Sequence, residues 1–95
     1  MVRIVYVAKK NDGIHHFGGS SQGKHMYMLC KYTDGFRLQI SRRSKAVLYH
    51  ISSAQLIDEN TVRFYRFGSD ADAVDVIPDN SEDARTLYMF WKERL

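Results

Sequence analysis

The sequence contains very little cysteine and proline, with Cys30 and Pro78 as the only residue of each kind. A single cysteine excludes an intrachain disulfide, and nothing else in the sequence indicates an oxidising compartment. One proline and six glycines in 95 residues argue against a disordered chain, and 44% of the residues are hydrophobic. We therefore expect one globular domain over residues 1–95 with a single modest core.

Long apolar runs and a strong charge imbalance are also missing. Every apolar stretch is far shorter than the ~20 residues that a transmembrane helix needs, and the apolar start, Met1–Ala8, is too short for a signal peptide. Fourteen Lys and Arg residues against eleven Asp and Glu leave a net charge of +3, a milder excess than dedicated DNA-binding domains usually carry. We expect a cytoplasmic protein with no transmembrane segment.

What the sequence does contain is a series of short segments rich in β-branched and aromatic residues, separated by turn residues. These segments predict strands at Val2–Ala8, His25–Tyr32, Phe36–Ile40, Ala46–Ile51, Thr61–Phe67 and Ala73–Ile77. Ala54–Ile57 either continues the strand before it or forms a strand of its own. The glycine-rich segment Lys9–Lys24 is predicted to be a long loop.

The residues Thr33-Asp34-Gly35 separate two of these strands and predict a β-hairpin. A two-residue Asp-Gly turn would place Phe36 opposite Thr33 and mix apolar with polar side chains. A three-residue loop with Gly35 in the left-handed conformation separates them, so we predict this loop. The apolar residues on the two sides of the turn then pair: Phe36, Leu38 and Ile40 with Tyr32, Cys30 and Met28.

A helix is predicted after Pro78 and closes the chain. Asp79 is the expected N-cap, with Glu82 completing a capping box, and Asn80 is the competing cap. Met89 and Phe90 fall outside the apolar stripe of this helix and are expected to form a second apolar flank. The stripe at helical spacing consists of Ala84, Leu87, Tyr88, Trp91 and Leu95.

The segment Gly18–Lys24 (GGSSQGK) has the G-x-x-x-x-G-K spacing of a phosphate-binding P-loop. That loop requires a strand before it, a helix after it, and a Ser or Thr after the Lys. Here His25 follows Lys24, and the next residues have a strand-like pattern. We therefore predict a glycine loop without nucleotide-binding function.

No other set of residues predicts catalysis or metal binding. The histidines His15, His16, His25 and His50 lack the paired spacings of a structural zinc site. Cys30 is predicted to lie on an apolar face, where a thiol is inert. The carboxylates occur mainly in turns and at the helix start, where they serve as solvated turn and cap residues. We predict no enzymatic activity, no metal and no cofactor.

The order of these elements resembles the pleckstrin-homology superfold, including its phosphotyrosine-binding branch. The similarity lies in Asp34–Leu95, in the segments DGFRLQI, AVLYHISSAQLIDENTVRFYRF and AVDVIPDNSEDARTLYMFWKERL, with VRIVYVA as the first strand. The resemblance implies a mainly β fold. It would be a small antiparallel sheet of six to seven strands, or a partly open barrel, closed by one C-terminal helix.

The same resemblance implies a binding module of the adaptor type. In such domains a partner peptide adds as a strand to an exposed sheet edge and lies against the closing helix. We therefore predict a protein or peptide partner. The matching positions are Ser53, Ala54, Gln55 and Leu56 on the edge strand, and Leu87, Phe90, Trp91 and Arg94 on the helix.

Two alternatives stay open. The basic turn containing Arg42, Arg43 and Lys45 could bind an anion, either a phosphoinositide or RNA. The chain could also be a small effector that binds and disables a host protein. The sequence leaves the identity of the partner and the oligomeric state open.

Overall fold

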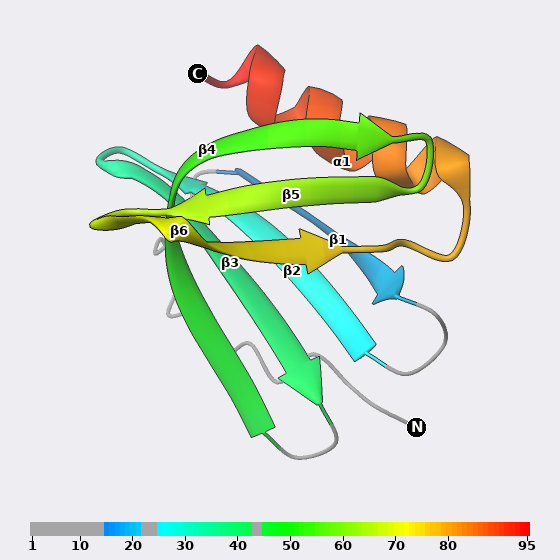
Figure 1. Ribbon diagram of the computed structural model, residues 1–95, viewed down its shortest axis with the longest axis horizontal. Coiled ribbons are helices and arrows are strands. Elements are labelled where there is room, and N and C mark those ends of the chain that lie inside the picture. The colour runs from blue at the N-terminus through cyan, green and yellow to red at the C-terminus, as the bar shows by residue number, and fades with distance from the viewer. Residues whose placement is uncertain (1–14, 22–24, 43–44) are drawn as a thin grey trace.

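The structure, a computed structural model, describes residues 15–21, 25–42 and 45–95. Within these residues six strands form one antiparallel sheet in sequential order, and one helix follows (Figure 1). The elements are β1 (His15–Ser21), β2 (His25–Tyr32), β3 (Gly35–Arg42), β4 (Lys45–Asp58), β5 (Thr61–Arg66), β6 (Ser69–Val76) and α1 (Ser81–Glu93). The predicted strand at Val2–Ala8 lies outside the described residues.

Strand β4 belongs to two layers of the molecule. Its first half pairs with β3 as far as Ile51, and its second half pairs with β5 from Ile51 onward. The register shifts between Ile51 and Ser53, which marks a bulge where the strand bends. Figure 1 shows β1, β2, β3 and the start of β4 in one layer, and the end of β4 with β5 and β6 in the other. The sheet stays open, and of the two alternatives for Ala54–Ile57 the structure has the one in which this segment continues the preceding strand.

The first and last strands meet at one point. The Ser21 hydroxyl donates to the Ile77 carbonyl at 2.7 Å, and the backbone N–H of Asp79 donates to the Ser20 carbonyl at 3.2 Å. The Ser20 hydroxyl also donates to the Asp79 carboxylate. We call this set of bonds the β1–β6 clasp.

Helix α1 packs against β4, β5, β1 and β2, and thus contacts both layers of the sheet. The side chains between helix and sheet form the hydrophobic core, and complete burial of one Leu, Val or Phe contributes about 1.5–3 kcal/mol. The core consists of Tyr27, Leu29, Phe36, Leu38, Ile51, Ala54, Val62, Phe64, Val76, Ala84, Leu87, Phe90 and Trp91. No helix in the described part of the chain is long and apolar enough to cross a membrane.

The predicted register of the first hairpin is wrong. Tyr32 pairs with Gly35, so the loop consists of two residues, Thr33 and Asp34, although Gly35 does have a positive φ of 141°. This register places Leu29 opposite Leu38, both fully buried in the core. It also places Lys31 opposite Phe36, and the Lys31 ammonium lies 4.7 Å from the centre of the Phe36 ring. Met28, Cys30 and Tyr32 therefore lie on the face opposite the core, where Cys30 is nonetheless buried.

The predicted loop Lys9–Lys24 is wrong over residues 15–21, which form β1. Gly19 permits close packing, because a Cβ atom there would lie 2.7 Å from the buried hydroxyl of Tyr27. Gly18 and Gly19 thus lie within a strand, and strand β2 follows where a P-loop requires a helix.

The helix begins one residue later than the preferred cap predicts. Asn80 is the N-cap, and its side-chain oxygen accepts a hydrogen bond from the Asp83 N–H at 2.8 Å. Asp79 belongs to the β1–β6 clasp instead. The second apolar flank predicted for Met89 and Phe90 is covered at Phe90 by strand β1. Phe90 is buried against Phe17 of β1, with ring centroids 6.2 Å apart, because strands of both layers contact the helix.

Tyr27 gives stability a specific dependence on pH. Its side chain is buried, and its hydroxyl has no hydrogen-bond partner among the described residues. Burial raises the pKa of Tyr27 above its ordinary value of 10.0, and the Asp83 and Asp79 carboxylates raise it further. The unfolded chain therefore loses this proton first. As the pH rises above about 10, the free energy of unfolding should fall by about 1.4 kcal/mol per pH unit from this residue.

Tyr27→Phe should remove this part of the pH dependence. Near pH 8 it should also raise the free energy of unfolding by about 1 kcal/mol, because a buried hydroxyl without a partner is removed. Urea unfolding of both proteins at about pH 8 and about pH 11 measures the two effects. Equal changes with pH in both proteins would contradict the assignment to Tyr27.

Asn80→Ala should lower the free energy of unfolding by about 1 kcal/mol, because the Asp83 N–H loses its acceptor. Asn80→Ser retains a capping oxygen without placing a second carboxylate beside Asp83, and should lose little stability. Thermal and urea unfolding of the two variants provide the comparison. Equal stability losses in both would show that the side-chain cap contributes nothing.

Candidate functional site: the β1 edge beside the C-terminal helix

The predicted peptide-binding residues of β4 divide between two faces. Ala54 and Leu56 point toward the core, opposite Phe64 and Val62 of β5. Ser53 and Gln55 point outward, and the Gln55 side-chain oxygen accepts a hydrogen bond from the Tyr65 hydroxyl at 3.1 Å. Beyond Ile51, no described strand pairs with β4 on its β3 side, which is the edge that the resemblance implies for peptide binding.

The predicted helix residues are used by the core. Leu87, Phe90 and Trp91 are 0%, 7% and 8% exposed, in the same cluster as Ala54. The Arg94 guanidinium lies 4.1 Å above the Phe90 ring and donates to the Phe90 carbonyl at 3.3 Å, so Arg94 covers the helix end. The structure therefore brings β4 and the helix together through core packing. A partner could reach Leu87 and Trp91 only if they left the core, whereas Phe90 also lines an open groove on the other flank of the helix.

An open groove lies on the other flank of the helix, between α1 and β1. Its volume is about 470 Å³, which is within the ~300–1,000 Å³ range of small-ligand pockets. Phe17 and Phe90 form its apolar floor, and Met89, 38% exposed, lies at its rim. We call this the β1–α1 groove; it is lined by His16, Phe17, Arg85, Thr86, Met89, Phe90, Glu93 and Arg94.

The backbone of β1 is available at this groove. The Ser20 carbonyl accepts from Asp79 and thus points away from β2. Because the hydrogen-bonding groups of a strand alternate between its two sides, those of Gly18 and His16 point the same way as those of Ser20. Both residues are exposed, and neither has a hydrogen bond on this side among the described residues. The edge therefore offers two consecutive outward-facing donor–acceptor positions.

The charges around the β1–α1 groove are mainly positive. Glu93 lies 3.9 Å from Arg94, which weakens the field of both side chains. Arg85 is exposed and forms no ion pair with any described residue. The Thr86 hydroxyl donates to the Glu82 carbonyl at 2.9 Å. A partner with an acidic side chain near Arg85 would therefore meet a favourable charge.

The predicted anion-binding residues lie at the other end of the molecule. Arg42 and Lys45 face each other across the β3–β4 turn and point to the same side of the sheet. Arg43 lies outside the described residues. The two described cations line an open cleft, which is distinct from the β1–α1 groove.

The described histidines and Cys30 do not gather into one site. His16, Cys30 and His50 lie on the outer face of neighbouring strands, with Arg37 between Cys30 and His50. Within the described ranges, no three His, Cys, Asp or Glu side chains form an arrangement that could hold a metal ion.

No protein-family model, curated protein or solved structure matches this chain. The resemblance to the pleckstrin-homology superfold therefore stays a prediction. Sequence reasoning missed the β1 part of the groove because glycines obscured the strand. The position of Met89 outside the helical stripe was the one signal that pointed to this flank.

The assignment of helix residues to core or groove can be tested by stability. Phe90→Ala should lower the free energy of unfolding by about 3–5 kcal/mol, because it removes a buried ring from the core. Met89→Ala should change it by less than about 0.5 kcal/mol, because Met89 lies at an exposed rim. Urea unfolding measures both. Similar losses for the two variants would show that the helix faces are misassigned.

Proposed function

We propose that this chain is a non-enzymatic interaction module that binds an extended peptide segment of a protein partner by strand addition at β1. The observation that carries the proposal is the pair of outward-facing backbone positions at His16 and Gly18, directly beside the β1–α1 groove. Edge strands with free N–H and C=O groups are templates for pairing with another chain. The resemblance to peptide-binding domains supports the same role, although it implies the β4 edge.

The groove supplies the contacts that strand addition needs. Hydrogen bonds to the backbone of β1 would contribute affinity for any extended peptide. Side chains of the bound strand alternate between its two faces, so every second residue can enter the groove. Phe17, Phe90 and Met89 favour an apolar residue there, and Arg85 favours an acidic neighbour. The module would therefore select short segments that combine apolar and acidic residues.

A library of extended peptides displayed on phage tests this proposal without a known partner. The affinity of peptides enriched on the native chain is then measured for the native chain and for two variants of His16. His16→Pro replaces the outward N–H by a ring carbon, which edge strands tolerate, and should abolish binding. His16→Ala keeps the N–H and should bind within about twofold of the native chain, since the backbone supplies the contact.

A second matched pair tests the groove. Met89→Asp places a charge at the groove rim and should weaken binding at least about tenfold, because an apolar contact is replaced by a desolvated carboxylate. Phe67→Asp changes another exposed apolar residue, located in the β5–β6 turn, and should have no effect. Peptides that bind His16→Pro and the native chain equally would refute strand addition at β1.

A further inference from the structure

A cleft with an apolar wall lies between the β3–β4 hairpin and β6. It consists of two adjoining hollows of about 160 Å³ and about 410 Å³, which share Ile40, Arg42 and Asp75. The larger hollow is lined by Ile40, Arg42, Lys45, Val47, Tyr49, Ala73, Val74 and Asp75. The smaller one extends toward Ser21, His25, Tyr27 and Val76.

The cleft exists because the two layers of the sheet diverge. Strand β6 pairs with β5, and the first half of β4 pairs with β3, so none of the six described strands joins β6 to the start of β4. The core-facing side of the β3–β4 hairpin therefore extends beyond the core. Leu38 is fully buried, whereas Ile40 and Tyr49 are only partly covered and Val47 is 36% exposed. The side chains of Ile40, Val47 and Tyr49 therefore form an apolar wall that lines the cleft.

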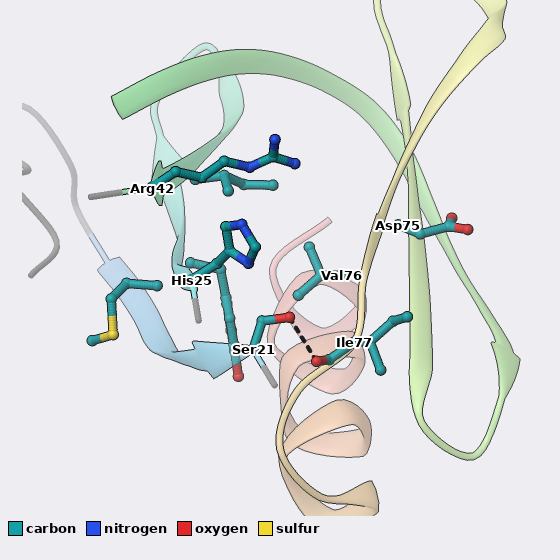
Figure 2. Close-up of a pocket in the computed structure, with 9 residues that line it drawn as sticks. Ser21, His25, Arg42, Asp75, Val76 and Ile77 are labelled. Atoms are coloured by element: carbon teal, nitrogen blue, oxygen red, sulfur yellow. Dashed lines mark hydrogen bonds between the residues drawn. The ribbon is translucent and has the colours of Figure 1, made fainter. Parts of the chain in front are cut away.

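Two cations lie at the end of this wall. Arg42 and Lys45 form a cross-strand pair on the same face as Ile40 and Val47, and both are exposed. Neither forms an ion pair with any described residue. Figure 2 shows the imidazole of His25 and the guanidinium of Arg42 on the same side of the cleft.

The nearest acidic residue of the lining does not neutralise these cations. The Asp75 side chain points away from Arg42 in Figure 2, and its carboxylate accepts from the Arg63 guanidinium at 2.8 Å and 3.1 Å. At the far end of the wall, the Arg66 guanidinium lies 5.2 Å from the centre of the Tyr49 ring and 3.8 Å from the Asp72 carboxylate. The cleft thus has two cations at its mouth and an apolar wall on the hairpin side, and polar atoms form much of the rest of its lining.

We propose that this cleft binds a single-chain anionic amphiphile of the fatty-acid class. The carboxylate head contacts Arg42 and Lys45, and the alkyl chain lies along Ile40, Val47, Tyr49 and Val74. Charge complementarity selects the head group, and the volume of about 410 Å³ is within the ~300–1,000 Å³ range of small-molecule sites. A free phosphate ion would use the cations but leave the apolar wall exposed. This site is separate from the β1–α1 groove and does not depend on the function proposed there.

Chain length provides the first test. The native protein is titrated calorimetrically with acetate, octanoate and dodecanoate below their micelle concentrations, and with inorganic phosphate. Affinity should rise about fourfold for each methylene that is buried, so dodecanoate should bind far more tightly than octanoate. Acetate and phosphate should bind weakly or not at all. Methyl NMR signals of Val47 and Val74 should shift with dodecanoate.

Matched variants provide the second test. Val47→Asp places a carboxylate on the proposed wall and should weaken dodecanoate binding at least about tenfold. Leu48→Asp changes the neighbouring exposed residue, which points to the opposite face, and should leave binding unchanged. Arg42→Gln with Lys45→Gln should weaken dodecanoate binding about tenfold, whereas Lys92→Gln on the helix should not. Thermal unfolding confirms that each variant is folded.

Three results would overturn the proposal. Equal affinity for phosphate and dodecanoate would show an anion site without a chain-binding wall. Equal loss in Val47→Asp and Leu48→Asp would show non-specific surfactant binding. Tight, salt-dependent binding of a short oligoribonucleotide that needs Arg42 and Lys45 but not Val47 would assign the cations to RNA instead.

Discussion

The bend in β4 at Ile51–Ser53 is the constraint on which the rest of the structure depends. One continuous strand of 14 residues pairs with β3 in its first half and β5 in its second. Ile51, at the bend, is 1% exposed, so the change of direction is fixed inside the core. Because the sheet turns there, its two layers enclose a core, and one helix of 13 residues is enough to cover the remaining side.

The same bend also determines where the molecule stays open. The layers meet at the β1–β6 clasp but diverge between β6 and the β3–β4 turn, which leaves the cleft. Helix α1 covers the core but not the edge of β1 near His16, which leaves the β1–α1 groove. The two candidate sites therefore follow from incomplete closure of the sheet rather than from any inserted loop. They differ in chemistry: the groove presents backbone groups beside an apolar floor, and the cleft presents two cations beside an apolar wall.

Much of this fold could be predicted from the sequence, because alternation and turn residues mark most strands and Pro78 marks the helix boundary. The register of the first hairpin could not be predicted. The pairing of Leu29 with Leu38 is favoured only once the second layer and the helix cover that face of the sheet. Strand β1 could not be predicted because its glycines resemble a loop, and the contact of Gly19 with the Tyr27 side chain appears only once β1 pairs with β2. The burial of Phe90 could not be predicted either, because it depends on contact with Phe17, which is distant in the sequence. Arg42 and Lys45 were identified as a basic pair, but the apolar wall beside them arises only from the tertiary arrangement.

The β1–β6 clasp has a consequence for the order in which the chain can fold. Every strand pair in the sheet joins neighbours along the chain, so each hairpin closes a short loop. The clasp joins Ser20 to Asp79 and Ser21 to Ile77, residues 59 and 56 positions apart. Its loop-closure cost is the larger one, and only the assembled meander brings its partners within reach. The clasp is thus a late contact, and the meander itself consists of local steps.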